Sequence, residues 1–154
     1  MIEQVIGDIL EAKEKYIVHQ CNCVSKGSAA GLAYFIFEKF PWADCYNGRM
    51  ENSIPGTIQI CGDGVERYVI NLFGQYYPGG SWKEFANDTA KLREEYFACC
   101  LGEILKIENL ESIAFPYTIG CGIGGGDWEH YLAMLEEFAI KTEAKVKIYN
   151  IEKV

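Results

Sequence analysis

The amino-acid sequence predicts an α/β fold, arranged as three layers (α/β/α) with a mixed central sheet, in one domain that spans residues 1–154. Short β-type apolar runs alternate with longer segments of helical periodicity along the chain. Strands separated by helices favour a largely parallel sheet with helices on both faces. A length of 154 residues fits one domain, and a hydrophobic content of 49% is enough to build a core.

The first half of the chain is predicted to form strands around one helix. Residues 17–21 are a short extended run. Residues 29–40 have the pattern of a helix that ends before Pro41, because the residue preceding a proline disfavours the helical conformation. Residues 57–61 and 68–73 are two β-type runs joined by a Gly-Asp-Gly connection, which is typical of a hairpin.

A long helix over residues 88–105 is the clearest element of the second half. Apolar residues recur at helical spacing along it, with charged residues between them. These apolar positions are Leu92, Tyr96, Cys99 or Cys100, and Ile104. Residues 112–116 follow as a buried strand.

The last helix is predicted over residues 128–141, and a strand over residues 146–151 closes the chain. Asp127 is expected to be the N-cap of this helix, because an aspartate at that position accepts a hydrogen bond from a free backbone N–H group. An apolar stripe marks the helix face that packs on the sheet. The stripe consists of Trp128, Tyr131, Leu132, Leu135 and Phe138.

Charge and hydropathy exclude several classes of partner. The net charge of −8 repels a nucleic-acid backbone, so we expect no sequence-independent nucleic-acid binding. No apolar run is long enough to span a bilayer, and the amino terminus lacks the pattern of a secretion signal. We therefore expect a cytoplasmic protein with no membrane partner.

The cysteine pattern predicts neither disulfides nor a metal site. Seven cysteines are an odd number, and no export signal accompanies them. Cys21 and Cys23 form a C-x-C pair and Cys99 is adjacent to Cys100, but neither pair has the spacing of a zinc site. We expect no metal and no other cofactor, and interpret most of the thiols as small buried groups in a reducing compartment.

Three segments are candidates for ligand binding, because each lies just past the carboxyl end of a predicted strand. In the first, Asp8 follows a strand and either caps a turn or accepts a hydrogen bond from an exocyclic amine such as that of adenine. In the second, residues 19–23 (His-Gln-Cys-Asn-Cys) lead into small residues over 25–33. Small side chains let a ligand approach the backbone at a helix N-terminus, although tight packing explains some of them.

The third segment, residues 119–128, reads Ile-Gly-Cys-Gly-Ile-Gly-Gly-Gly-Asp-Trp. Five glycines in seven positions cost backbone entropy on folding. Successive N–H groups facing a phosphate would explain them. No Gly-Lys-Ser/Thr follows, and the segment comes too late in the chain for the dinucleotide G-x-G-x-x-G motif.

These three segments, in this order, resemble the macrodomain family. The resemblance rests on Gly7-Asp8-Ile9, on a strand ending at Asn22 before a Gly/Ala-rich helix entry, and on residues 120–125 before a Trp-containing helix. It covers essentially the whole chain. The His-x-Cys-Asn pattern, with Phe40-Pro41 after it, is most similar to the branch of yeast-type ADP-ribose-1″-phosphate phosphatases. That branch is close to terminal-ADP-ribose and DNA-ADP-ribose glycohydrolases.

The resemblance implies an ADP-ribose site. Asp8 and Ile9 would hold adenine, residues 28–32 would cradle the distal ribose and a phosphate, and residues 119–125 would wrap the diphosphate. Asn22 would face the distal ribose, and Phe73 would stack beside the ligand. The implied ligand-binding residues are Asp8, Ile9, Asn22, Ser28, Ala29, Ala30, Gly31, Leu32, Phe73, Ile119, Gly120, Cys121, Gly122, Ile123, Gly124 and Gly125.

Two departures from the family pattern concern catalysis. The glycohydrolases of this branch use a lysine after the strand that matches residues 68–73, and this sequence has Gln75 there. The terminal-ADP-ribose type also uses an acid in the third loop, where Gly124 stands. Catalysis through a lysine adduct is therefore not expected.

His19, Asn22 and Asp127 are the remaining catalytic candidates. His19 is a proton-transfer candidate that titrates near neutral pH, or a satisfied histidine within its strand. Asp127 lies near the phosphate loop, or serves only as a helix N-cap. The cysteines lack a base that would lower their pKa. We expect that alanine at His19 or Asn22 lowers turnover and leaves ADP-ribose binding largely intact.

The leading hypothesis is a metal-independent hydrolase acting on ADP-ribose 1″-phosphate or on an ADP-ribosyl adduct. The second is a non-catalytic ADP-ribose reader or sequestering protein, favoured by the missing lysine and acid. The third is an unrelated α/β domain whose glycines serve packing. Residues 76–82 are expected to form a mobile exposed loop that acts as a substrate lid or a partner surface.

Overall fold

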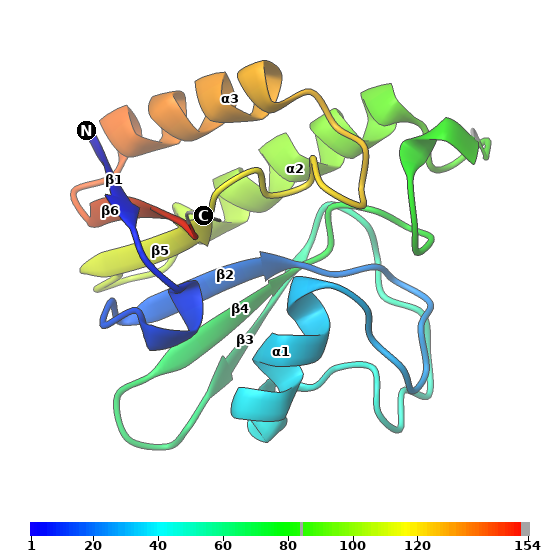
Figure 1. Cartoon of the computed structure of the whole chain (residues 1–154), viewed down its shortest axis with the longest axis horizontal. Coiled ribbons are helices and arrows are strands. Elements are labelled where there is room, and N and C mark those ends of the chain that lie inside the picture. The colour runs from blue at the N-terminus through cyan, green and yellow to red at the C-terminus, as the bar shows by residue number, and fades with distance from the viewer. Residues whose placement is uncertain (84, 152–154) are drawn as a thin grey trace.

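The computed structural model describes residues 1–83 and 85–151 (Figure 1). Within this part of the chain six strands form one sheet, in the order β1-β6-β5-β2-β4-β3. The strands are β1 (Ile2–Ile6), β2 (Tyr16–Gln20), β3 (Ile58–Gly62), β4 (Tyr68–Leu72), β5 (Ser112–Pro116) and β6 (Lys145–Asn150). The helices are α1 (Leu32–Lys39), α2 (Ala90–Ile104) and α3 (Trp128–Lys141), with 3-10 turns η1 (Ile9–Glu11), η2 (Pro41–Ala43) and η3 (Ser81–Lys83).

The sheet is mixed and largely parallel, as predicted. All neighbouring strands pair in parallel except β3 and β4, which form the predicted antiparallel hairpin. The carboxyl ends of β1, β6, β5, β2 and β4 therefore meet at one edge of the sheet. Loops that follow those strands share that edge, which is where α/β sheets bind ligands.

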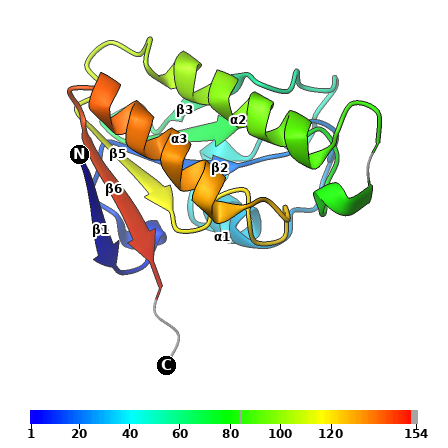
Figure 2. The ribbon, with the colours of Figure 1, turned by 90° about the horizontal axis from the view of Figure 1, so that it is seen from above.

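Helices cover both faces of the sheet, which confirms the three-layer arrangement. Figures 1 and 2 show α2 and α3 together on one face and α1 on the other. Alternate residues of each strand serve the two cores. On β2, Val18 packs in the core beneath α2 and α3, whereas Ile17 packs in the core beneath α1.

The first helix begins later than predicted. Residues 29–31 are not helical, and α1 starts at Leu32. The reason is Gly31, whose φ of 62° and ψ of −142° lie outside the helical region and in a conformation that only glycine adopts easily. Ala29 and Ala30 therefore belong to the loop. Where the bounds of a predicted strand differ from the observed ones, they differ by one residue.

The second helix buries part of the predicted stripe: Cys100 and Ile104 are fully buried, and Leu92 and Tyr96 are half-buried. Its buried residues are Arg93, Phe97, Cys100, Leu101 and Ile104, whereas Cys99 is exposed. The buried face is centred slightly away from the predicted stripe, because it begins at Arg93, a charged residue that the apolar pattern leaves out. The helix also starts at Ala90, with Thr89 as its N-cap, because Asp88 is committed to an ion pair with Arg93.

The third helix is confirmed in both bounds and cap. Asp127 Oδ1 accepts a hydrogen bond from the Glu129 amide at 3.0 Å. Tyr131, Leu135 and Phe138 of the predicted stripe are buried, and Trp128 and Leu132 pack partly buried beside them.

Among the described helices none is both long and apolar enough to cross a membrane. All seven cysteines have free thiols. Over residues 1–83 and 85–151, no cluster of three or more His, Cys, Asp or Glu side chains is placed to hold a metal ion.

Candidate functional site

A cavity of about 590 Å³ opens at the carboxyl edge of the sheet. Three connections form its walls: the loop after β2, the segment after β4 and the glycine-rich loop after β5. This volume is typical of a site that takes a small molecule or cofactor.

The loop after β2 is fixed by Asn22. Its Oδ1 accepts hydrogen bonds from the amides of Val24 at 3.0 Å and Ser25 at 2.8 Å, and its Nδ2 donates to Ser25 Oγ at 2.9 Å. From outside the cavity, the Arg49 guanidinium donates to the carbonyl oxygens of Ser25 at 3.1 Å and Asn22 at 3.2 Å. The backbone is thus held from both sides before it reaches Gly31.

The N-terminus of α1 faces this cavity without a side-chain cap. Gly31 is the N-cap residue, and no described side chain accepts a hydrogen bond from the first amides of the helix. Gly31, Leu32 and Ala33 all border the cavity. The first N–H groups of a helix have no partner within it and carry positive potential, so this end of α1 is suited to an anion.

The glycine loop supplies a second set of free amides. Its own turns use three amides: Cys121 N donates to Thr118 O at 2.8 Å, Gly125 N to Gly122 O at 3.2 Å, and Gly126 N to Gly120 O at 3.0 Å. Over the part of the chain that the structure describes, the N–H groups of Gly122, Ile123 and Gly124 have no protein acceptor.

Two of these glycines are required by packing. A Cβ at Gly120, where φ is 77°, would lie 2.7 Å from Tyr131 Cε2. A Cβ at Gly124 would lie 2.6 Å from the carbonyl oxygen of Gly120. No larger residue fits at either position with the backbone in place, so part of the glycine run has a structural cause.

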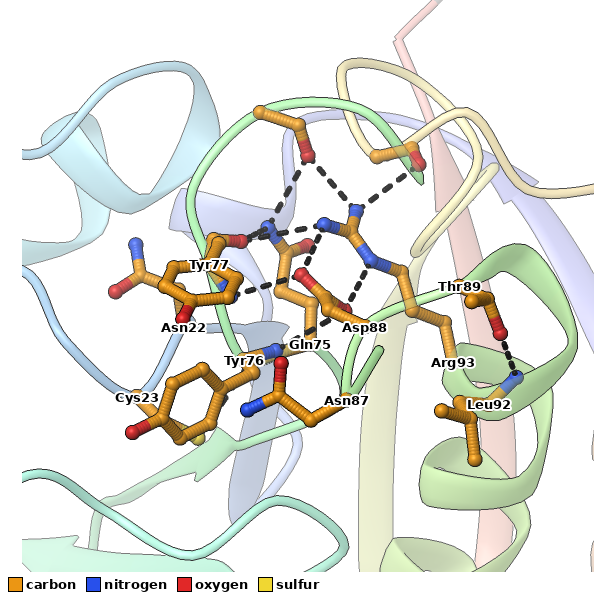
Figure 3. Close-up of polar contacts among 12 residues, drawn as sticks. Asn22, Cys23, Gln75, Tyr76, Tyr77, Asn87, Asp88, Thr89, Leu92 and Arg93 are labelled. Atoms are coloured by element: carbon orange, nitrogen blue, oxygen red, sulfur yellow. Dashed lines mark hydrogen bonds and ion pairs between the residues drawn. The ribbon is translucent and has the colours of Figure 1, made fainter. Parts of the chain in front are cut away.

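The segment after β4 forms a rim of the cavity through Pro78 and Gly79. Gln75 Nε2 donates to Tyr77 O at 2.8 Å, and Asp88 accepts the Tyr77 amide at 2.9 Å (Figure 3). Arg93 donates to Gly79 O at 2.8 Å. These buried contacts hold residues 76–80 in place, so this part of the expected loop is packed into the molecule.

The cavity wall carries little acid–base chemistry. Among its described lining residues there is no Asp, Glu, Lys, Arg or Cys. Gln75, at the position of the expected family lysine, has its side chain committed: Oε1 accepts from Gln20 Nε2 at 2.8 Å, and Nε2 donates to the rim. Gln20 Oε1 is buried and has no hydrogen-bond partner among residues 1–83 and 85–151.

His19 is buried on β2, and its Nε2 lies 2.6 Å from Asn71 Oδ1. Burial lowers the pKa of His19 to about 4, against a smaller opposing effect of the hydrogen bond to Asn71. The expectation that His19 titrates near neutral pH is therefore wrong: the imidazole is neutral and donates to Asn71.

No family model matches the sequence, and no curated protein matches it. Solved structures do match it along nearly its whole length. The macrodomain of Mycobacterium tuberculosis DarG has a TM-score of 0.73 and 24% identity, over 97% of each chain. The macrodomain of Thermus aquaticus DarG has a TM-score of 0.70 and 25% identity, over 99% of each chain.

A third similar structure is a mutant of the Oceanobacillus iheyensis macrodomain with ADPR. It has a TM-score of 0.69 and 24% identity, over 99% of this chain and 86% of that one. The chain has the macrodomain fold. The sheet order and the layers described above are thus those of a macrodomain, as the sequence motifs predicted.

The cavity brings together most of the predicted site. Two of the three segments that the sequence singled out, the loops after β2 and β5, lie on its wall. The predicted residues that line it are His19, Asn22, Ser28, Ala29, Ala30, Gly31, Leu32, Ile119, Gly120, Gly122, Ile123 and Gly124.

Two predicted adenine contacts lie outside the cavity wall. Asp8 caps η1, where its Oδ1 accepts a hydrogen bond from the Leu10 amide at 2.9 Å. Ile9 is buried in the core beneath α1. Both follow β1, an edge strand that β6 separates from β5, so neither borders the cavity beyond β5.

Phe73 and Asp127 are also away from the wall. Phe73 is buried in the core beneath α1, where the Arg49 guanidinium lies 5.8 Å from its ring centre. The exposed Asp127 caps α3, and its Oδ2 lies 3.7 Å from His130 Nε2. The helix-cap interpretation therefore accounts for Asp127.

Cys121 and Gly125 belong to the glycine loop but do not border the cavity. Burial raises the pKa of the Cys121 thiol to about 12 and that of Cys23 to about 12. Neither thiol is a nucleophile at neutral pH, because the thiolate is the reactive form.

Several lining residues were not predicted, chiefly Gln20, Tyr46, Tyr117 and Thr118. Gln20 ends β2 and Tyr117 follows β5, so their positions at carboxyl ends of strands were a usable signal. Thr118 has a φ of 59°, which is rare for a β-branched residue and is typical of backbone held by its surroundings at a binding site.

Proposed function

We propose that this macrodomain binds ADP-ribose in the cavity at the carboxyl edge of its sheet. The observation that carries the proposal is the convergence, from two sides, of backbone N–H groups that have no partner within the described chain: those at the start of α1 and those of Gly122 to Gly124. A diphosphate is the part of ADP-ribose that such groups bind without basic side chains. The similar Oceanobacillus iheyensis structure with ADPR supports the same ligand.

Binding of ADP-ribose without catalysis is the function that the residues lining the cavity support best. A general acid or base needs a titratable group within reach of the reacting atoms. Of the described lining residues, His19 has a pKa of about 4 and the others with ionisable side chains are tyrosines. The side chain of Gln75 is already bonded to Gln20 and Tyr77.

Hydrolysis of an ADP-ribose derivative is the second candidate, with ADP-ribose 1″-phosphate or an ADP-ribosyl adduct as substrate. The position of Asn22 favours it, because its Nδ2 lies at the wall with one hydrogen bonded to Ser25 and a second one available. Positioning and N–H groups that face developing charge would then supply the rate, with water as nucleophile. The adenine contact at Asp8 stays a prediction.

Calorimetric titration of ADP-ribose into the wild-type protein tests the proposal, with Gly122→Val as the blocking variant. A Cβ at Gly122 meets no protein atom within 4 Å, and Gly122 borders the cavity. Valine there should fill ligand space without straining the fold, and weaken binding about ten-fold or more. Gly102→Val is the matched control, because a Cβ at Gly102 on α2 is equally unobstructed and lies outside the cavity.

Addition of ADP-ribose 1″-phosphate, with released phosphate measured, separates the two candidates. Binding without release supports recognition alone, and release that Asn22→Ala abolishes supports hydrolysis. Absence of ADP-ribose binding by the wild-type protein, or equal binding by Gly122→Val, would overturn the proposed site.

A further inference from the structure

Arg93 is a fully buried arginine on α2 that lies behind the cavity wall. Its side chain is 2% exposed and it does not border the cavity. Its Nε and Nη2 donate to the two oxygens of Asp88, at 2.8 and 2.7 Å. Figure 3 shows this guanidinium between the Asp88 carboxylate and a set of backbone carbonyl oxygens.

The remaining donors of Arg93 join two walls of the cavity. Nη2 donates to Tyr77 O at 3.3 Å, and Nη1 donates to Gly79 O at 2.8 Å and to Gly124 O at 3.1 Å. Gly79 belongs to the rim after β4, whereas Gly124 belongs to the glycine loop after β5. All five N–H groups of the guanidinium are therefore used, and one side chain holds both segments.

These carbonyl oxygens matter because the neighbouring site is suited to an anion. A carbonyl oxygen carries partial negative charge and repels a phosphate, whereas an N–H group attracts it. Gly124 O accepts from both Arg93 and the Ser81 amide, while the N–H groups of Gly122 to Gly124 have no acceptor among the described residues. The Arg93 guanidinium thus hydrogen-bonds to a carbonyl oxygen of the loop, which would repel a phosphate. It leaves free the N–H groups of the loop, which attract a phosphate.

Asp88 completes the arrangement as the counter-charge of Arg93. It also accepts the amides of Tyr76 at 3.3 Å and Tyr77 at 2.9 Å, which fixes the start of the rim. Burial raises the pKa of Asp88, but hydrogen bonds from Arg93 and from these amides outweigh burial and lower it on balance. The ion pair adds no net charge to the wall.

We propose that Arg93, paired with Asp88, is the positioning residue of the anion site: it fixes the rim and the glycine loop with their carbonyl oxygens turned away from the ligand. This inference rests on the proposed ADP-ribose binding. It makes affinity depend on a side chain that never touches the ligand, because a preorganised loop avoids the entropy cost of ordering on binding.

Arg93→Lys tests the inference, with Arg67→Lys as the matched control. Lysine keeps the charge beside Asp88 but has three donors at one atom, so it cannot reach both loops. We expect about ten-fold weaker ADP-ribose binding, equivalent to the loss of one or two hydrogen bonds. We also expect faster amide hydrogen exchange in the ligand-free protein at the hydrogen-bonded amides of the two segments, which are those of Tyr76, Tyr77, Ser81, Gly125 and Gly126. Arg67, which donates to Ala12 O at 2.7 Å and does not border the cavity, should show neither effect.

A purely structural role for Arg93 would give a different result. Unchanged affinity in Arg93→Lys, or faster exchange confined to α2, would overturn the inference. If Arg93→Lys fails to fold, the double variant Arg93→Met with Asp88→Leu removes both charges and leaves no unpaired buried ion. It is expected to fold with the same two defects, and wild-type affinity in it would equally refute the positioning role.

The exchange measurement also separates this inference from the proposed function. Failure of the wild-type protein to bind ADP-ribose overturns the proposed function. Exchange in the ligand-free protein still decides whether Arg93 holds the two loops, since it needs no ligand.

Discussion

His19 is a buried base that stays neutral in the folded protein, because burial lowers its pKa. Its pKa falls from an ordinary value of 6.5 to about 4, so the unfolded chain binds a proton more readily than the folded protein between these two values. Stability from this residue is fully present above about pH 6.5 and is lost as the pH falls toward about 4. The shift corresponds to about 3 kcal/mol of unfolding free energy.

Urea unfolding of wild-type protein and His19→Gln, between about pH 7 and about pH 4.5, measures this contribution. Glutamine keeps an N–H donor for Asn71 but does not titrate, so the variant should lose less stability on acidification. Parallel pH dependence of the two proteins would refute the assignment of a neutral buried imidazole. A neutral His19 also predicts ADP-ribose binding that is insensitive to pH between about 6 and 8.

At the scale of elements, His130 joins α3 to α2 with the opposite dependence on pH. Its Nδ1 lies 3.0 Å from Glu94 Oε2 on α2, and its Nε2 lies 3.7 Å from Asp127 Oδ2. The hydrogen bond to Glu94 raises the pKa of His130, with further contributions from the charges of Asp127, Glu94 and Glu129. Because the folded pKa lies above the unfolded value of 6.5, the stabilisation is complete below about pH 6.5 and is lost as the pH rises through the folded pKa.

Thermal melts of wild-type protein and His130→Gln should therefore differ more at about pH 6 than at about pH 8.5. Glu94→Gln removes the same link from the α2 side and should reproduce the pattern. A difference that is equal at both pH values would mean that the contact contributes through packing and not through charge.

How much of the fold followed from the sequence depends on whether the signal was local. The third helix was predicted in full, because Asp127 and the apolar stripe after it specify an N-cap and a buried face within one segment. The sheet class followed from the alternation of strands and helices. The start of α1 did not, because Gly31 fits both a helix interior and the left-handed conformation that it adopts.

The residues of the candidate site were likewise predictable only where the signal was local. Small residues in the loops after β2 and β5 were recognisable, because close approach of backbone to ligand requires them. Arg93 was not recognisable as a buried residue, because a charged side chain in a helix is normally solvated and only the tertiary structure supplies its acceptors. Phe73 was placed beside the ligand from its position at a strand end, without the side-chain direction that buries it beneath α1. Asp8 was assigned to adenine by the family resemblance, and that contact remains a prediction.

At the scale of the whole molecule, a net charge of −8 surrounds a cavity that has no charged lining residue over the described chain. The long-range field therefore repels an anionic ligand, and the attraction comes only from N–H groups inside the cavity. Salt screens the long-range repulsion much more than it screens short contacts in an enclosed site. A protein that binds phosphates through lysines and arginines behaves in the opposite way.

Long-range repulsion combined with short-range attraction by N–H groups predicts the sign of the salt dependence of ADP-ribose affinity. Raising sodium chloride from about 0.05 M to about 0.3 M should leave the affinity for ADP-ribose unchanged or make it slightly stronger. Calorimetric titration at several salt concentrations measures it, with a single-stranded oligonucleotide as a second ligand that should not bind. A steep loss of ADP-ribose affinity with salt would mean that basic side chains contact the diphosphate. The amide groups of α1 and the glycine loop would then be insufficient to explain the anion site.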